Sequence, residues 1–154
     1  MCRVRFGTVP IRDRIFAALA DPLSARWERK YGADLRRRLL SEARGRVLEI
    51  GVGTGQSFPH YPDVDELVGI EPSEPMLHRA RQRAAESHRE VTLVEASAEQ
   101  LPFEDDSFDT VVTMAVLCTV DDPARSLREI RRVLRPDGRF RFSEHVRSAD
   151  PKLK

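Results

Sequence analysis

The chain has 154 residues, of which 40% are apolar and 33% are charged, as is typical of a single globular domain. Its net charge of +1 gives no indication of a nucleic-acid partner, and no apolar run approaches the roughly 20 residues that span a bilayer. The two cysteines, Cys2 and Cys118, form no C-x-x-C pair, so we predict neither a disulfide framework nor a metal site. No secretory signal is visible, and we expect a cytoplasmic protein.

Charge is unevenly distributed along the chain. Residues 1–46 carry 12 lysine and arginine residues against 5 acidic residues, whereas the remainder carries 14 against 20. Residues 11–43 are predicted to form one or two helices with a break near Asp21-Pro22, and we interpret residues 1–45 as an N-terminal helical cap. The basic cap is either a contact for an anionic partner or a solvated helix face.

Short β-rich runs alternate with helical runs after residue 45. The predicted strands are Val47–Ile50, Leu67–Glu71, Val91–Glu95, Phe108–Met114 and Arg139–Val146. The predicted helices run from Glu74 to about Ala85, capped by Ser73, and from Asp122-Pro123 onward, with an apolar stripe of Leu127, Ile130 and Leu134. This alternation predicts an α/β fold: a Rossmann-like, doubly wound, mainly parallel sheet of about five strands with helices on both faces.

Three glycines at alternate positions, Gly51, Gly53 and Gly55, follow the first predicted strand. Glycine permits a tight turn with positive φ and lets a ligand approach the backbone. Glu71 ends the next strand, where a carboxylate can accept hydrogen bonds from both ribose hydroxyls of a nucleoside. The alternative is that Glu71 only caps the following helix.

The glycine spacing bears on which nucleoside is bound. Dinucleotide folds usually carry G-x-G-x-x-G, whereas this turn reads G-x-G-x-G with Glu49 two residues before it. S-adenosylmethionine has no pyrophosphate but carries an ammonium group, which Glu49 could bind directly or through water. Alternatively, Glu49 is a buried structural acid. A nicotinamide-dependent oxidoreductase is the least favoured function for this turn, because its glycine spacing differs.

Four segments resemble the motifs of class I S-adenosylmethionine-dependent methyltransferases, of the type 11 or ubiquinone-methyltransferase-like kind. They are residues 47–55 (VLEIGVGTG), 69–77 (GIEPSEPML), 96–103 (ASAEQLPF) with 107–109 (SFD), and 127–138 (LREIRRVLRPDG). Residues 116–120 (VLCTV) and 144–146 (EHV) look like the methyltransferase-like-seven group of small-molecule thiol methyltransferases. Ubiquinone-type C-methyltransferases and bacterial phospholipid N-methyltransferases share most of these motifs, so the acceptor atom stays open.

The resemblance implies S-adenosylmethionine as cofactor and a small molecule as methyl acceptor. It implies that Gly51 and Gly53 lie at the methionine part of the cofactor and Glu71 at the ribose, and that Gly55 belongs to the same cofactor-binding turn. In the family, the adenine contacts fall at Pro72, Met76, Ser97, Ala98 and Glu99. Met114 would lie near the methyl-donor end, although a flexible core filler is an equal alternative.

Catalysis is less legible in the sequence. Methyl transfer from a sulfonium needs chiefly positioning and desolvation, so no obligatory catalytic triad is expected. His145 could deprotonate a thiol or hydroxyl, and Glu144 stands beside it. His145 is otherwise an exposed residue at a strand end, and Cys118 is interpreted as a small buried hydrophobic residue. No catalytic residue is assigned.

The chain also departs from the resembling family, which usually has an antiparallel hairpin of strands six and seven after strand five. The chain stops at Lys154, about eight residues past the predicted fifth strand. We therefore expect residues 46–154 to form a C-terminally short, truncated methyltransferase domain that self-associates through the edge of the fifth strand. The alternative function is a catalytically inactive or partner-dependent fragment that binds S-adenosylmethionine.

Overall fold

The computed structural model describes residues 31–145. The break predicted near Asp21-Pro22 and most of the N-terminal helical cap lie outside the described residues. The elements in chain order are α2 (Ala33–Leu40), β1 (Arg46–Ile50), η2 (Phe58–His60), β2 (Glu66–Ile70), α3 (Glu74–Glu86), β3 (Thr92–Val94), β4 (Phe108–Met114), α4 (Pro123–Val133) and β5 (Leu134–Ser143). Strands and helices thus alternate as predicted from β1 onward.

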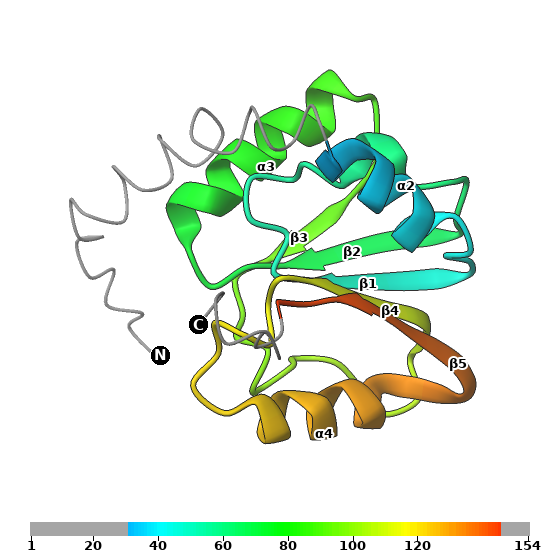
Figure 1. Cartoon of the computed structure of the whole chain (residues 1–154), viewed down its shortest axis with the longest axis vertical. Helices are drawn as coiled ribbons and strands as arrows, with labels where there is room; N and C mark the ends of the chain where they lie inside the picture. Colours follow the sequence, from blue (N-terminus) through cyan, green and yellow to red (C-terminus); the bar gives the residue numbers. More distant parts are fainter. Residues whose placement is uncertain (1–30, 146–154) are drawn as a thin grey trace, which may run out of the picture.

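The five strands form one parallel sheet in the order β3-β2-β1-β4-β5. In Figure 1, α2 and α3 cover one face of this sheet and α4 covers the other. The expected doubly wound α/β fold is therefore confirmed. The chain runs outward from β1 to β3, then returns to pair β4 with the other side of β1, so the strand order reverses between β1 and β4. Ligands of open α/β sheets bind at such a reversal, outside the carboxyl ends of the strands.

Alternate residues of the central strands supply two separate cores. Leu48, Ile70 and Val111 face α4, where Ile130 and Val133 of that helix pack on them. On the opposite face, the core contains Val47, Leu67 and Val112 with Leu40 of α2 and Leu77 of α3. Because β1 and β4 are covered on both faces, most of their consecutive residues are buried, including the polar Glu49, Thr110 and Thr113, rather than every second one.

Helix starts and buried faces follow the sequence only in part. The Asp122 side chain accepts a hydrogen bond from the Arg125 N–H and caps α4 as predicted. Ser73 stands at the N-cap position of α3, but its side chain makes no capping hydrogen bond. Leu127 was predicted to join the apolar stripe of α4, but it is 44% exposed because the helix buries Ser126, Ile130 and Val133 instead.

β5 begins earlier and ends earlier than predicted. Leu134 already pairs with Phe108 of β4, and the register then shifts so that Thr110 pairs with Arg139. The intervening Pro136-Asp137-Gly138 segment, whose residues are typical of a turn, lies within this irregular stretch of β5. The strand ends at Ser143 rather than at Val146.

Candidate functional site

A cleft of about 270 Å³ lies at the reversal between β1 and β4, at the carboxyl ends of the strands. Its lining includes six of the residues predicted to bind cofactor: Gly51, Glu71, Pro72, Ser97, Ala98 and Glu99. The other five predicted residues, Glu49, Gly53, Gly55, Met76 and Met114, do not line it. The structure thus brings residues from the 69–77 and 96–103 segments together with the start of the glycine turn.

The glycine turn has the backbone conformation that its sequence predicts, with φ of +73° at Gly51, +54° at Gly53 and +80° at Gly55. A Cβ atom at Gly51 would stand 2.5 Å from Val116 Cγ2, and one at Gly55 would stand 2.4 Å from Phe58 Cε2. A Cβ atom at Gly53 would meet nothing within 4 Å. Gly51 and Gly55 are therefore required by packing, whereas Gly53 faces open space.

Glu71 follows β2 and connects the glycine turn with the start of α3. Its Oε2 accepts a hydrogen bond from the Gly53 N–H at 3.1 Å, and its Oε1 accepts one from the Ser73 N–H at 3.1 Å. Burial raises the pKa of the Glu71 carboxyl, while these two backbone donors act in the opposite direction. Each oxygen keeps a further lone pair for another donor.

Glu49 lies in the core beneath the glycine turn and is only 3% exposed. Burial raises the pKa of its carboxyl to about 7, and the hydroxyl groups of Ser57 and Tyr61 and the positive charge of Arg36 oppose this shift. Its Oε2 atom is buried and has no hydrogen-bond partner among the described residues. Glu49 is thus a buried acid with one free acceptor atom, a combination that suits a cationic ligand group nearby.

Ser97, Ala98 and Glu99 form the opposite wall of the cleft, in the connection from β3 to β4. The Ser97 hydroxyl bonds with Glu99 Oε2 at 3.1 Å, and Glu99 Oε1 accepts a hydrogen bond from the Asp122 N–H at 2.8 Å. These hydrogen bonds lower the pKa of the Glu99 carboxyl, with the Asp122 N–H contributing most. Glu99 therefore also ties this wall to the start of α4.

Residues 116–120 were noted in the sequence for their resemblance alone, and no cofactor contact was predicted for the segment between β4 and α4, which supplies the remaining wall. The cleft residues of this segment are Ala115, Val116, Thr119, Val120 and Asp121. Ala115 has a φ of +56°, in the left-handed region. Alanine has no preference for that conformation, so its sequence does not predict this turn.

The catalytic candidates lie together beyond the ends of β4 and β5. Cys118 Sγ stands 3.8 Å from His145 Nδ1, and both residues are exposed. The prediction that Cys118 is a buried hydrophobic residue is therefore wrong, because Cys118 lies in the turn that follows the end of β4 at Met114. Glu144 Oε1 accepts hydrogen bonds from the Thr113 hydroxyl and the Val116 N–H.

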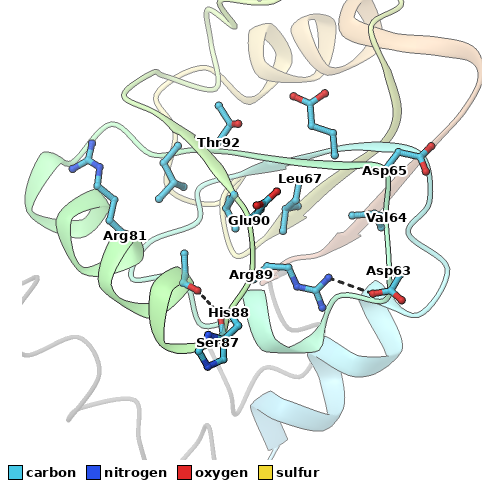
Figure 2. A pocket seen from close by; sticks show the side chains of 14 residues that line it. Asp63, Val64, Asp65, Leu67, Arg81, Ser87, His88, Arg89, Glu90 and Thr92 are labelled. Carbon is cyan, nitrogen blue, oxygen red and sulfur yellow. Dashed lines mark hydrogen bonds and ion pairs between the residues drawn. The ribbon is translucent and has the colours of Figure 1, made fainter.

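A second hollow, of about 860 Å³, lies at the other end of the sheet, where β2 and β3 begin. Figure 2 shows Asp63, Asp65 and Glu90 around it together with Arg81 and Arg89, so both charges are mixed in its lining. It lies at the amino ends of the strands, away from the reversal where ligands of this fold bind. Within residues 31–145, no group of three or more potential metal ligands is clustered, and no helix has the length and apolarity needed to cross a membrane.

Comparison with known proteins identifies the family. The methyltransferase domain matches residues 48–142. Phosphatidylethanolamine N-methyltransferase of Cereibacter sphaeroides is 42% identical over 103 residues, covering 66% of this chain and 51% of that protein. Thiol S-methyltransferase TMT1B of Homo sapiens is 37% identical over 112 residues, covering 70% of this chain and 46% of that protein.

A solved structure agrees with both relatives. The crystal structure of an S-adenosylmethionine-dependent methyltransferase of Thermotoga maritima is 32% identical with a TM-score of 0.64, covering 83% of this chain and 59% of that chain. The chain spans about half the length of the curated relatives it matches. Its match to the methyltransferase domain confirms the family predicted from the four sequence motifs. The chain belongs to the S-adenosylmethionine-dependent methyltransferases.

Proposed function

We propose that this chain binds S-adenosylmethionine in the 270 Å³ cleft and in the open space beside it at Gly53, and transfers its methyl group to a small-molecule acceptor. The observation that carries the proposal is the open space at Gly53, directly beside the Glu71 carboxylate at the strand-order reversal. A ligand can reach the backbone at this point, and a hydrogen-bond acceptor stands next to it.

The residues present fit this cofactor. Glu71 would accept hydrogen bonds from the ribose hydroxyls, and the free buried oxygen of Glu49 would attract the ammonium group, directly or through water. Pro72 and the segment from Ser97 to Glu99 would border the adenine. Met76 and Met114 lie outside the cleft lining, and we retain their contacts with adenine and the methyl-donor end as proposals. When bound, the cofactor supplies an electrophilic methyl group, and the protein orients it and excludes water.

The two relatives are named for different methyl acceptors. One name gives the nitrogen of phosphatidylethanolamine, and the other gives the sulfur of a thiol. Cys118 and His145 lie exposed beyond the carboxyl end of the sheet, where an acceptor would approach. An imidazole there could take the proton from a thiol, which supports a small thiol as the first acceptor to test. A cytoplasmic location remains a prediction from the sequence.

The second candidate is a chain that binds S-adenosylmethionine without turnover or only with a partner. It is favoured by Phe142, which is 59% exposed on β5, and by the outer edge of that strand, which pairs with no strand among residues 31–145. An acceptor wall that needs another chain would leave cofactor binding intact and abolish methyl transfer.

Calorimetry with S-adenosylhomocysteine, and with NAD as the control ligand, tests cofactor binding. Glu71→Ala should weaken S-adenosylhomocysteine roughly ten- to a hundred-fold, because charge-assisted hydrogen bonds contribute about 1.5–3 kcal/mol. Unchanged affinity in a folded variant would place the ribose elsewhere. Transfer of radiolabelled methyl groups to a small thiol, compared with ethanolamine, then separates the active enzyme from the inactive chain.

A further inference from the structure

The turn after β4 holds an alanine in a conformation that residues with a Cβ atom rarely adopt. Ala115 has a φ of +56°, in the left-handed region. Both Ala115 and the buried Val116 line the cofactor cleft. A disfavoured backbone conformation therefore shapes part of the cleft wall, and it persists only where its surroundings enforce it.

Ser143, the last residue of β5, and Glu144, which follows it, supply that enforcement through three hydrogen bonds. The Ala115 N–H donates to the Ser143 carbonyl oxygen at 2.8 Å. The Val116 N–H and the Thr113 hydroxyl each donate to Glu144 Oε1 at 3.1 Å. One carboxylate oxygen thus bridges the residues that flank the turn on either side.

The enforced turn also bears on the glycine turn. Val116 Cγ2 stands 2.5 Å from the position of a Cβ atom at Gly51, so the two turns pack directly against each other. At the far end of the same segment, Asp122 is held by Glu99. The cleft wall of residues 115–121 is therefore anchored at each end by a carboxylate from another part of the chain.

We propose that Glu144 is a positioning residue of the cofactor site. Its Oε1 fixes the left-handed turn at Ala115 and thereby holds Val116 against the glycine turn. This inference rests on the proposed function. It requires Glu144 only as a hydrogen-bond acceptor, whereas a general base would need the carboxylate charge. Its Oε2 atom, which is buried and unpartnered among the described residues, takes no part in holding the turn.

Two substitutions separate these roles. Glu144→Gln keeps an acceptor oxygen, while Glu144→Met keeps similar bulk without one. We expect E144Q to bind S-adenosylhomocysteine within about threefold of the wild type. E144M should bind about tenfold more weakly, because it removes the acceptor of both hydrogen bonds that hold the turn. Glu104→Met, at an exposed acidic residue away from the cleft, is the matched control and should change nothing.

A rescue experiment tests the link to the turn itself. Glycine adopts positive φ without steric cost, so Ala115→Gly in the E144M background should recover most of the lost affinity. Amide exchange reports the arrangement without any ligand: the Val116 N–H should be protected in the wild type and in E144Q and should exchange faster in E144M. If E144M folds too poorly to measure, the A115G/E144M double variant takes its place, and its failure to fold contradicts the proposal.

Other outcomes overturn the inference. Equal losses in E144Q and E144M would assign the effect to the charge of Glu144, and wild-type affinity in E144M would show that the turn needs no carboxylate. If the wild type does not bind S-adenosylhomocysteine, the proposed function fails. The exchange rates of Val116 then still decide whether Glu144 holds the turn.

Discussion

Gly53 and Gly55 are close in sequence but differ in their surroundings: Gly53 faces open space, whereas Gly55 packs against Phe58. Gly53→Val should lower the free energy of unfolding by about 1–2 kcal/mol. The loss comes only from holding a residue with a Cβ atom at positive φ, because the side chain itself enters open space. That space is where the cofactor is proposed to lie, so S-adenosylhomocysteine binding should be lost. Gly55→Ala is the matched comparison: its Cβ atom would meet Phe58, and overpacking adds a further loss of about 1–3 kcal/mol.

Thermal melts and calorimetry of both variants measure the two effects separately. Undiminished binding in a folded G53V protein would show that the ligand does not approach the turn at this position. Equal losses of stability in the two variants would contradict the difference in packing.

Glu49 predicts a pH dependence of stability. The pKa of its carboxyl is about 7 in the folded protein against an ordinary 4.5, so the folded state binds the proton more tightly than the unfolded state. The free energy of unfolding should therefore fall as pH rises from about 4.5 to about 7, by up to roughly 3 kcal/mol. Glu49→Gln should remove this slope, which urea unfolding of both proteins across that pH range measures.

The same residue predicts the pH dependence of binding. A bound ammonium group favours the charged carboxylate, so S-adenosylmethionine affinity should rise between about pH 6 and about pH 8 in the wild type. E49Q should show no such rise in calorimetry. A parallel rise in both proteins would mean that another group titrates and that Glu49 has only a structural role.

At the scale of elements, Arg132 attaches α4 to the connection between β3 and β4. Its guanidinium donates to the Leu101 and Phe103 carbonyl oxygens and to the carboxylates of Glu129 and Asp105. Arg132→Ala should lower the free energy of unfolding by about 1.5–3 kcal/mol, because it leaves partly buried acceptors without their charged donor. Arg131→Ala, on the exposed side of the same helix, is the control. Equal denaturation midpoints for the two variants would refute this role.

The elements also show where sequence reasoning succeeds. β4 has the predicted bounds because a run of β-branched residues buried on both faces has one interpretation. β5 begins five residues early because Leu134 fits both the apolar period of α4 and the start of a strand, and only pairing with Phe108 decides between them. Cys118 follows two apolar residues, as a core residue would, but the chain has already passed the edge of the sheet.

The candidate site divides in the same way. Glycine turns and strand-end acids leave a mark in sequence, since few other residues suit those positions, and Glu71 lies beside Gly53 as the spacing suggests. The place of residues 115–121 in the cleft wall could not be predicted locally, because the turn at Ala115 is held by Ser143 and Glu144, and Glu144 lies 28 residues after its partner Val116. Contacts between distant segments are the part of the site that local patterns do not encode.

At the scale of the whole molecule, we predict self-association through β5. Its outer edge pairs with no strand among residues 31–145, and Phe142 is exposed beside it. An unpaired edge with an apolar side chain is a template for a second copy of the chain. Light scattering after size-exclusion chromatography should show a concentration-dependent increase in mass, which Phe142→Lys should reduce. If the wild-type protein is a monomer at every concentration, this interface is ruled out.

The ion pairs of Glu42 with Arg139 and Arg141 have a consequence for the order of folding. Glu42 follows α2 near the start of the described chain, yet its partner Arg141 is 99 residues later. Arg141 also donates to the carbonyl oxygens of Arg38 and Leu39, so the helix is fastened to the last strand. During synthesis, α2 cannot acquire these contacts until β5 has left the ribosome. Because closing so long a loop is slow, docking of α2 on β5 belongs among the last steps of folding.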